Sequence, residues 1–510
     1  MDLIKTFILS LSITVMLSIL LPEQVEGQSH NYWTRSFNEE TSLLSGAVVG
    51  GGAGSAAIYF NPAGIAENTE SSLSVNASLF SFKFLKVENA LGDGIDLNYS
   101  RGIIEPRFIS YNIKPKNHPG LNLEIAFLNN ENYSLEFTHS LENEIDVLKN
   151  LEGDERYYSF FNYTNNYRDD WIGIGVPLKL SPKLFLGTSM FLSIRSLDYR
   201  YVTDTEAFPL DSAFSGSQQE PFYSANYQDY EYLGFNDYRL LWKFGLLYKS
   251  ERISFGINLT TPSVGHIYSD GKKVSRKTKQ SNITSPETGE PLPDYTLVDY
   301  KEAKDVSVND KSPLSVSAGI TYLFPEKKMT LYSTFEYFAG IDTYRLVEAD
   351  ESADLAAGLP IQDFEFNEWL TFVSGAKPVL NGALGFRWCI NQDLMFLSGF
   401  RTDFNYRKNL EYSPFASRKK INGVDLDVYH VTSGLSLKIK GQYLIVGIQY
   451  SAGRNKNKEQ FINLSDPSEF NTTELAPLQG TRQNNVNSTL NAFSIYFGAT
   501  FNFGGKEKSK

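Results

Sequence analysis

Apolar and polar residues alternate with a period of two along most of the chain. Between Val379 and Ile390, one face carries Leu380, Gly382, Leu384, Phe386, Trp388 and Ile390, and the other carries Asn381, Ala383, Gly385, Arg387 and Cys389. A similar alternation runs through the last apolar segment, from Leu490 to Phe503. Because successive side chains of a strand point to opposite faces, the pattern predicts β-strands with one apolar and one mixed face.

The predicted strands occur in pairs. Short polar segments such as "SPK", "KSER", "PEKK", "NQD" and "KGQY" join the two members of a pair, as in β-hairpins. Long polar stretches separate the pairs: Thr203–Asp237, Tyr268–Lys311, Glu351–Lys377, Asn409–Val424 and Asn455–Asn487. The five pairs, the three predicted strands that precede Ile172 and the final strand together give about fourteen strands. Short turns that alternate with long loops are typical of outer-membrane barrels.

A soluble β-sandwich also alternates, but the aromatic residues favour a barrel. Tyr248, Phe324, Trp388 and Phe503 lie on the apolar faces beside the short turns, where a barrel has its interfacial aromatic girdle. The opposite faces carry charged residues that a lumen can hold: Glu124, Lys243, Glu336, Arg387, Arg401, Asp403 and Lys438. We therefore predict an all-β fold, an antiparallel transmembrane β-barrel of about 14 strands.

The N-terminus predicts export. An apolar run from Thr6 to Leu21 is followed by Pro22, and Val25 and Gly27 stand at the −3 and −1 positions before Gln28. The run is shorter than the roughly 20 residues that a spanning helix needs, so a cleaved signal peptide is favoured over a membrane anchor. We assign residues 1–27 to the signal peptide and place the mature chain in the bacterial outer membrane.

Composition excludes several classes of function. The net charge of −12 argues against a nucleic-acid partner, which needs a basic face. The single cysteine, Cys389, excludes a disulfide framework and a cysteine metal site. No calcium-loop, phosphate-loop or nucleophile-elbow motif is present, so we expect no cofactor, no metal site and no catalytic residues. Of the five histidines, His430 has no serine on its own face next to it, and we interpret it as a lumen residue with ordinary hydrogen bonds.

A glycine-rich segment precedes the first strand. Gly52, Gly54 and Ala57 match the dinucleotide fingerprint formally, but Pro62 interrupts the helix that a pyrophosphate site requires. The block "LLSGAVVGGGAGSAAIYFNPAGIAENTESSLSVNASLF", from Leu43, resembles the N-terminus of the FadL/TodX family of outer-membrane transporters for hydrophobic compounds. The motif that carries the resemblance is Asn61-Pro62-Ala63.

The resemblance implies a fourteen-stranded barrel whose N-terminal segment folds inward as a hatch. We accordingly expect a hatch at residues 28–70, a barrel at residues 71–504 and a C-terminal tail at residues 505–510. Glycine and alanine suit a segment that packs closely inside a lumen. The interpretation of Asn61-Pro62-Ala63 as a turn that only seats the hatch, without contacting a ligand, stays open.

Two groups of polar residues are candidate site residues. Arg387, Arg401 and Asp403 are expected to form a charged cluster in the lumen, with a structural ion-pair ladder as the favoured interpretation. Asn129, Asn130, Glu131 and Asn132 interrupt the apolar face of the third strand. Since hydrocarbon cannot solvate these groups, the strand either leaves the membrane as a loop here or kinks inward, as a lateral gate would require.

The leading functional hypothesis is a non-enzymatic, passive channel for hydrophobic small molecules such as long-chain fatty acids. Its expected partners are outer-membrane lipid, the hydrophobic substrate and the barrel assembly machinery. The alternative is a barrel that docks partner or cargo proteins through long extracellular loops.

Overall fold

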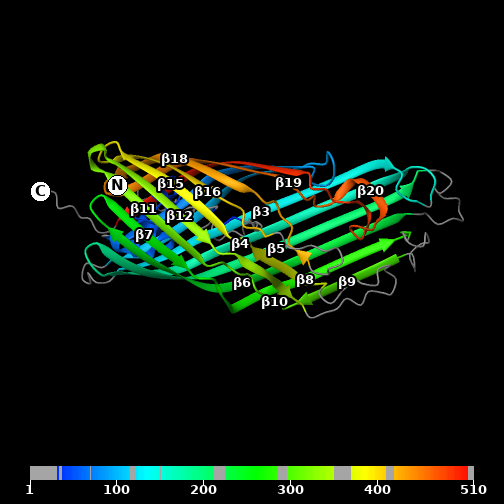
Figure 1. Ribbon diagram of the computed structural model, residues 1–510, viewed down its shortest axis with the longest axis horizontal. Coiled ribbons are helices and arrows are strands. Elements are labelled where there is room, and N and C mark those ends of the chain that lie inside the picture. The colour runs from blue at the N-terminus through cyan, green and yellow to red at the C-terminus, as the bar shows by residue number, and fades with distance from the viewer. Residues whose placement is uncertain are drawn as a thin grey trace, which may run out of the picture.

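The computed structural model is an elongated barrel of antiparallel strands (Figure 1). It describes residues 31–33, 37–68, 70–114, 122–149, 151–210, 224–284, 296–349, 369–408 and 419–502. The expected signal peptide, residues 1–27, and the expected tail, residues 505–510, lie outside the described residues, as does Phe503. Fourteen strands follow one another around the wall, and pairing of the fifth with the sixth closes the barrel. The predicted fold class and strand number are confirmed.

The wall strands differ in length. Those of the first half are β1 (Ser72–Glu88), β2 (Leu97–Ile113), β3 (Leu123–Ile145), β4 (Glu155–Lys179), β5 (Leu184–Pro209), β6 (Ala225–Lys249) and β7 (Ile253–Thr260). Those of the second half are β11 (Ser315–Phe324), β12 (Met329–Phe338), β15 (Val379–Cys389), β16 (Leu394–Asp403), β18 (Asp427–Ile439), β19 (Gln442–Lys458) and β22 (Val486–Asn502). The strands from β3 to β6 extend furthest from the short turns.

Several stretches that were predicted as loops are strands, so those predictions are wrong. Most of Thr203–Asp237 belongs to β5 and β6. Tyr268–Lys311 contains most of β8 (Val264–Ser281) and all of β9 (Thr296–Lys304), which extend the sheet beside β6. Asn455–Asn487 includes the hairpin of β20 (Asn463–Asn471) and β21 (Ala476–Gly480). Polar residues on both faces of a strand hide its period, which explains the error. The remaining strands are β10 (Ser307–Val308), β13 (Ile341–Glu348), β14 (Phe372–Ala376) and β17 (Lys419–Lys420).

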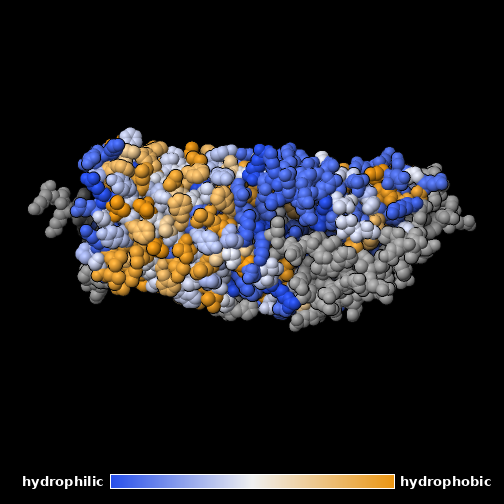
Figure 2. Space-filling model, viewed as in Figure 1, coloured by the Kyte–Doolittle hydropathy of each residue, from blue (hydrophilic) through white to orange (hydrophobic). Residues whose placement is uncertain are grey.

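An apolar belt covers the half of the barrel that carries the short turns. Figure 2 shows hydrophobic residues gathered there and a hydrophilic surface beyond. The outward side chains include Ile172, Ile174, Val176 and Leu178 on β4 and Leu380, Leu384 and Trp388 on β15, all exposed. Tyr248 and Trp388 are exposed beside the short turns, as a girdle requires. The belt therefore faces lipid.

The opposite strand faces enclose the predicted charged residues. Glu124, Lys243, Arg401 and Asp403 are almost fully buried. Lys438 lies on the same face of β18 as the buried Thr432 and Ser436, but it is exposed because it stands next to the turn between β18 and β19. No helix in the described ranges has the length and apolar character needed to cross a membrane.

Short helical turns inside the barrel form the hatch. They are α2 (Glu39–Leu43), η1 (Gly54–Ala56), α3 (Ala57–Phe60) and η2 (Pro62–Glu67); a further short turn, η3 (Pro325–Lys327), lies in the wall between β11 and β12. Wall glycines let the hatch approach the strands. A Cβ atom built at Gly245 would lie 2.1 Å from Asn61 Oδ1. Only glycine fits this contact.

Aromatic residues fill the lumen of the long-strand end. Phe161 and Tyr163 of β4 and Tyr199 of β5 belong to one buried apolar cluster with Trp369 and Phe372. The Tyr163 hydroxyl donates to Asn422 O at 2.7 Å. Burial raises the pKa of Tyr163 and of Tyr199 above the ordinary tyrosine value, so both phenols keep their protons at neutral pH. The extension beyond the belt is thus a packed structure with its own core.

The lipid-facing assignment predicts a depth-dependent cost of charge. Leu384 is 57% exposed within the belt, whereas Glu136 of β3 is exposed beyond it. We expect Leu384→Arg to destabilise the barrel by about 2–4 kcal/mol, as arginine does at the bilayer midplane. Glu136→Arg serves as the control and should change stability little. Unfolding in lipid vesicles, followed by heat-modifiable mobility, measures both, and equal costs would contradict the belt assignment.

Candidate functional site: an opening between two wall strands

The pairing between β2 and β3 is much shorter than that of the neighbouring strands. Hydrogen-bonded partners run only from Phe108–Leu128 to Ile113–Leu123. By contrast, β2 pairs with β1 up to Leu97, and β3 pairs with β4 up to Ile145. The backbone pairing of β2 and β3 therefore ends at Phe108 and Leu128, and beyond this point side chains cross between the strands, as where Arg101 Nη1 donates to Ser134 Oγ at 2.9 Å. Unpaired backbone is tolerated at membrane depth only where protein or a cavity receives it.

A β-bulge in β3 lies at the point of separation. The register with β4 shifts between Asn129, which pairs with Asp170, and Glu131, which pairs with Asp169, so Asn130 is the extra residue. A bulge bends its strand and increases the local twist. Because β3 continues to Ile145, the loop interpretation of this segment is wrong. The irregularity falls within the four residues that the sequence singles out.

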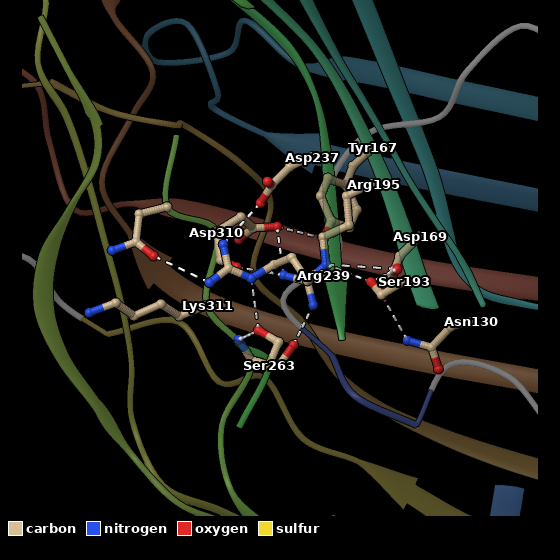
Figure 3. A network of polar contacts seen from close by, with 12 residues as sticks. Asn130, Tyr167, Asp169, Ser193, Arg195, Asp237, Arg239, Ser263, Asp310 and Lys311 are labelled. Atoms are coloured by element: carbon tan, nitrogen blue, oxygen red, sulfur yellow. Dashed lines mark hydrogen bonds and ion pairs between the residues drawn. The ribbon is translucent and has the colours of Figure 1, made fainter. Parts of the chain in front are cut away.

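Polar side chains of β4 hold the bulge in place (Figure 3). Asn130 Nδ2 donates to Asp169 Oδ2 at 3.2 Å, and Asn129 Nδ2 donates to Asp170 Oδ1 at 2.6 Å. The Asp169 carboxylate also accepts a hydrogen bond from Trp171 Nε1 at 2.8 Å. The run "RDDW" thus faces "NNEN" across two strands, a pairing of polar segments that sequence reasoning missed.

The network continues to a buried arginine. Arg195 of β5 is 2% exposed; its Nη1 lies 3.1 Å from Asp310 Oδ2, and its Nε lies 3.8 Å from Asp169 Oδ1. Tyr167 also donates to Asp310, at 2.9 Å. Removing one partner of a buried ion pair costs roughly 3–5 kcal/mol because the other charge stays uncompensated. The bulge is therefore anchored to a rigid polar cluster.

An apolar cavity of about 120 Å³ adjoins the opening. Both edges of the opening contribute to its lining, Tyr99 and Arg107 from β2 and Tyr133 and Ser134 from β3. The apolar part of the lining consists of Leu85, Leu135, Val424, Leu426, Val428, Leu490 and Ala492. The cavity therefore borders both strands at the point where their backbone pairing has ended.

One side of this cavity is polar. His430 Nδ1 lies 2.7 Å from Ser451 Oγ, and Gln449 Nε2 donates to the same hydroxyl at 2.9 Å. Asp403 Oδ2 lies 3.7 Å from His430 Nε2, beyond hydrogen-bond distance, so serine, histidine and aspartate do not form a connected triad. The hydrogen bonds of His430 agree with the role expected of it. Its proximity to Ser451 was missed because the two residues lie on neighbouring strands.

The predicted charged cluster is divided. Arg401 and Asp403 lie beside this polar side, and Arg401 Nη2 donates to Gln449 Oε1 at 3.5 Å. Arg387 instead lies 3.8 Å from Glu40 Oε2 of the hatch and over the ring of Tyr332. Arg401 therefore lies beside the polar side of the cavity and Arg387 beside the hatch, although the sequence predicts that they belong to one cluster.

The N-terminal segment separates two cavities. Asn31 lines the apolar cavity, and Tyr32 lines a second, more polar one of about 100 Å³. The Tyr32 ring stacks between Phe338 and Tyr406, with centroid distances of 4.3 and 4.1 Å. The bulge residues Asn130 and Glu131 line the second cavity. The bulge thus faces the lumen.

The Asn61-Pro62-Ala63 motif lies between the hatch and the wall. Asn61 Oδ1 accepts a hydrogen bond from Ala63 N at 3.2 Å, which caps η2, and Pro62 stands at its first position. Asn61 Nδ2 donates to Val49 O at 2.9 Å and to Leu246 O of β6 at 3.0 Å. The motif makes these contacts away from both cavities' linings.

Comparison with solved structures identifies the architecture. No family model and no curated protein sequence matches the chain. A FadL homologue of Pseudomonas aeruginosa matches with a TM-score of 0.52 at 10% identity, over 93% of this chain and 100% of that one. The toluene transporter TodX of P. putida matches with a TM-score of 0.51 at 13% identity, over 94% and 100%. The chain has the FadL/TodX-type transporter fold.

This likeness concerns the fold alone, because the identities are low. A closed antiparallel barrel with an apolar belt and exposed aromatic residues beside its short turns is typical of proteins of the bacterial outer membrane. The hatch, the opening and the cavity described above are properties of this chain's own residues.

The close contact between Gly245 and the hatch can be tested. We expect Gly245→Ala to displace Asn61 and loosen the hatch, because the new methyl group would overlap its side-chain oxygen. The barrel should still fold, and its ion conductance in planar bilayers should rise. Gly382→Ala, on the lipid-facing side near the movable ring of Phe335, is the control. An unchanged conductance of folded Gly245→Ala would show that this contact does not seal the lumen.

Proposed function

We propose that the protein is a passive outer-membrane transporter of hydrophobic small molecules and that the opening between β2 and β3 is its lateral gate. The observation that carries the proposal is the junction of this opening with the apolar cavity, lined from both of its edges by Tyr99, Arg107, Tyr133 and Ser134. A hydrophobic molecule in the cavity can pass into the bilayer without crossing the polar surface layer. Movement follows the concentration gradient.

The bulge keeps the gate open in this proposal. Asn130 adds one residue to β3, and the strand edge turns away from β2 where the bulge occurs. The buried network around Asp169 and Arg195 fixes that geometry in the absence of substrate. The gate is therefore a gap in the backbone ladder of the resting wall, crossed by side chains such as Arg101 and Ser134, and it needs no energy source.

The substrate class is proposed from the two-sided cavity lining. Leucine and valine side chains suit an alkyl chain, while Arg107 and Lys83 line the same cavity and suit an anionic head group. A long-chain fatty acid combines both features, and the cavity of about 120 Å³ would hold its head group and only the adjoining part of its chain. TodX is described as a toluene transporter, and a neutral aromatic hydrocarbon is accordingly the competing substrate.

Deleting Asn130 tests the gate. The deletion removes the extra residue while leaving the register with β4 regular on both sides, so β3 should straighten alongside β2. We expect a folded barrel whose uptake of hydrophobic substrate into cells or liposomes is abolished. Asn130→Ala is the matched control, because it keeps the extra residue and should keep most of the uptake. Full uptake by the deletion variant would disprove the lateral gate.

Replacing Arg107 tests the substrate class. A charge-assisted hydrogen bond contributes about 1.5–3 kcal/mol, so Arg107→Gln should weaken oleate binding by roughly tenfold or more. Binding of toluene should change little. Equal effects on the two ligands would reject recognition of a carboxylate by Arg107. If the unaltered protein takes up neither ligand, docking of a protein partner becomes the better hypothesis.

A further inference from the structure

The paired part of β2 and β3 contains buried oxygen atoms that lack donors. Asn112 and Glu124 are direct cross-strand partners on the luminal face, and both are 0% exposed. Cβ atoms of such partners lie about 4.5–5.5 Å apart. Asn122, two residues before Glu124, is directed toward the same side, because its amide contacts the hatch. The three side chains therefore share one small region between wall and hatch.

Hydrogen bonds to the hatch fix the orientation of both amides. Asn112 Nδ2 donates to Glu70 O at 2.9 Å, and Asn122 Nδ2 donates to Ile65 O at 2.8 Å. Since a carbonyl oxygen can only accept, the nitrogen of each amide must face the hatch. The Oδ1 atoms of Asn112 and Asn122 consequently point away from these carbonyls.

Four buried acceptors remain without a donor within the described part of the chain: Asn112 Oδ1, Asn122 Oδ1, Glu124 Oε1 and Glu124 Oε2. The neighbouring Ser110 hydroxyl contacts both Ser55 O, at 3.1 Å, and Glu124, and its single proton can satisfy only one of these two acceptors. Lys114, two residues beyond Asn112, donates through Nζ to Asn68 O at 2.6 Å. A buried carboxylate without hydrogen bonds or a counter-charge is strongly unfavourable.

We propose that Glu124, Asn112 and Asn122 form a binding site for a hard cation, Ca²⁺. The site lies at the inner end of the β2–β3 seam, that is, at the Ile113–Leu123 end of the segment over which β2 and β3 are paired. Carboxylate and amide oxygens are the ligands that Ca²⁺ prefers, and its flexible coordination accepts a bidentate Glu124 with water completing the shell. Mg²⁺ fits less well because it demands a nearly ideal octahedron. Motif searches overlook such a site, since amides supply half of its oxygens.

Bound Ca²⁺ would clamp the hatch to the wall. The same asparagines that supply oxygen to the cation hold the hatch carbonyls of Glu70 and Ile65 through their nitrogens. The cation also bridges β2 and β3 over their short paired segment. This clamp is independent of what the barrel transports.

Calcium binding to the full-length barrel, purified in detergent and freed of metal with EDTA, tests the proposal. With one carboxylate, the affinity should lie in the range of extracellular calcium sites, a Kd of roughly 10⁻⁴–10⁻³ M. In equilibrium dialysis we expect the unaltered protein to bind one more equivalent of ⁴⁵Ca²⁺ than the Glu124→Gln variant. We also expect calcium to raise the Tm of the unaltered protein. Glu124→Gln, a neutral side chain of the same shape, should lose both effects.

Glu136→Gln removes an exposed carboxylate from the same strand and is the control. It should keep the calcium equivalent and the rise in Tm that Glu124→Gln loses. Heat-modifiable mobility verifies that each variant is folded. Equal calcium binding by the Glu124→Gln variant and the unaltered protein would place the cation elsewhere and overturn the proposal. Absence of binding to the unaltered protein would also overturn it and would mean that Glu124 is neutralised by a proton.

Discussion

The requirement that backbone polar groups be paired inside a bilayer governs this molecule. A closed ladder of fourteen strands meets it around almost the whole wall, and the wall strands exchange hydrogen bonds along their length in the belt. The seam between β2 and β3 departs from it, because pairing stops at Phe108 and Leu128. A departure in this environment persists only if other parts of the structure support it. The bulge at Asn130, its polar anchors and the cavity behind the seam supply that support.

The network that holds the bulge buries several charges, and burying them is unfavourable unless each has partners. This explains why the network includes so many hydrogen bonds. Asp169, Arg195 and Asp310 are taken out of water. Asp169 accepts hydrogen bonds from Trp171 and Ser193, Asp310 accepts one from Tyr167, and Arg195 donates one to Ser193. Such a cluster is stable only when its members are well satisfied, and it then has a single arrangement. The bulge is held by the same cluster, because Asn130 donates a hydrogen bond to Asp169. An opening in the wall can thus exist in the resting state without making the barrel soft.

Much of the fold could be predicted from the sequence because lipid and lumen impose opposite demands on alternate residues. The alternation from Leu380 to Ile390 and the aromatic residues at Tyr248 and Trp388 follow directly from that demand. Beyond the membrane the outer face of a strand meets water, and its inner face mixes aromatic residues such as Tyr199 with polar residues such as Thr203. The alternation is therefore weak in β8, β9 and the outer parts of β5 and β6, and the sequence predicts loops there.

The candidate site was only partly predictable for a different reason. The interruption at Asn129–Asn132 is local in sequence and could be recognised. Its partners Asp169, Arg195 and Asp310 come from three other segments, and Arg107 reaches the cavity from β2. Only the register of the closed barrel brings them together. The same is true of Ser451 beside His430, which are cross-strand partners.

The two ends of the β2–β3 seam have opposite physical requirements. At its outer end the strands must stay apart, and an extra residue in β3 prevents pairing. At its inner end the strands must stay together, because Asn112 and Asn122 hold the hatch by donating hydrogen bonds to the carbonyl oxygens of Glu70 and Ile65. Backbone pairing over so short a segment contributes little to holding β2 and β3 together and to fixing the hatch on the wall. Polar side chains directed from the wall into the hatch add contacts there without lengthening the ladder, which would narrow the opening. The placement of Asn112 and Glu124 just below the separation follows from this conflict.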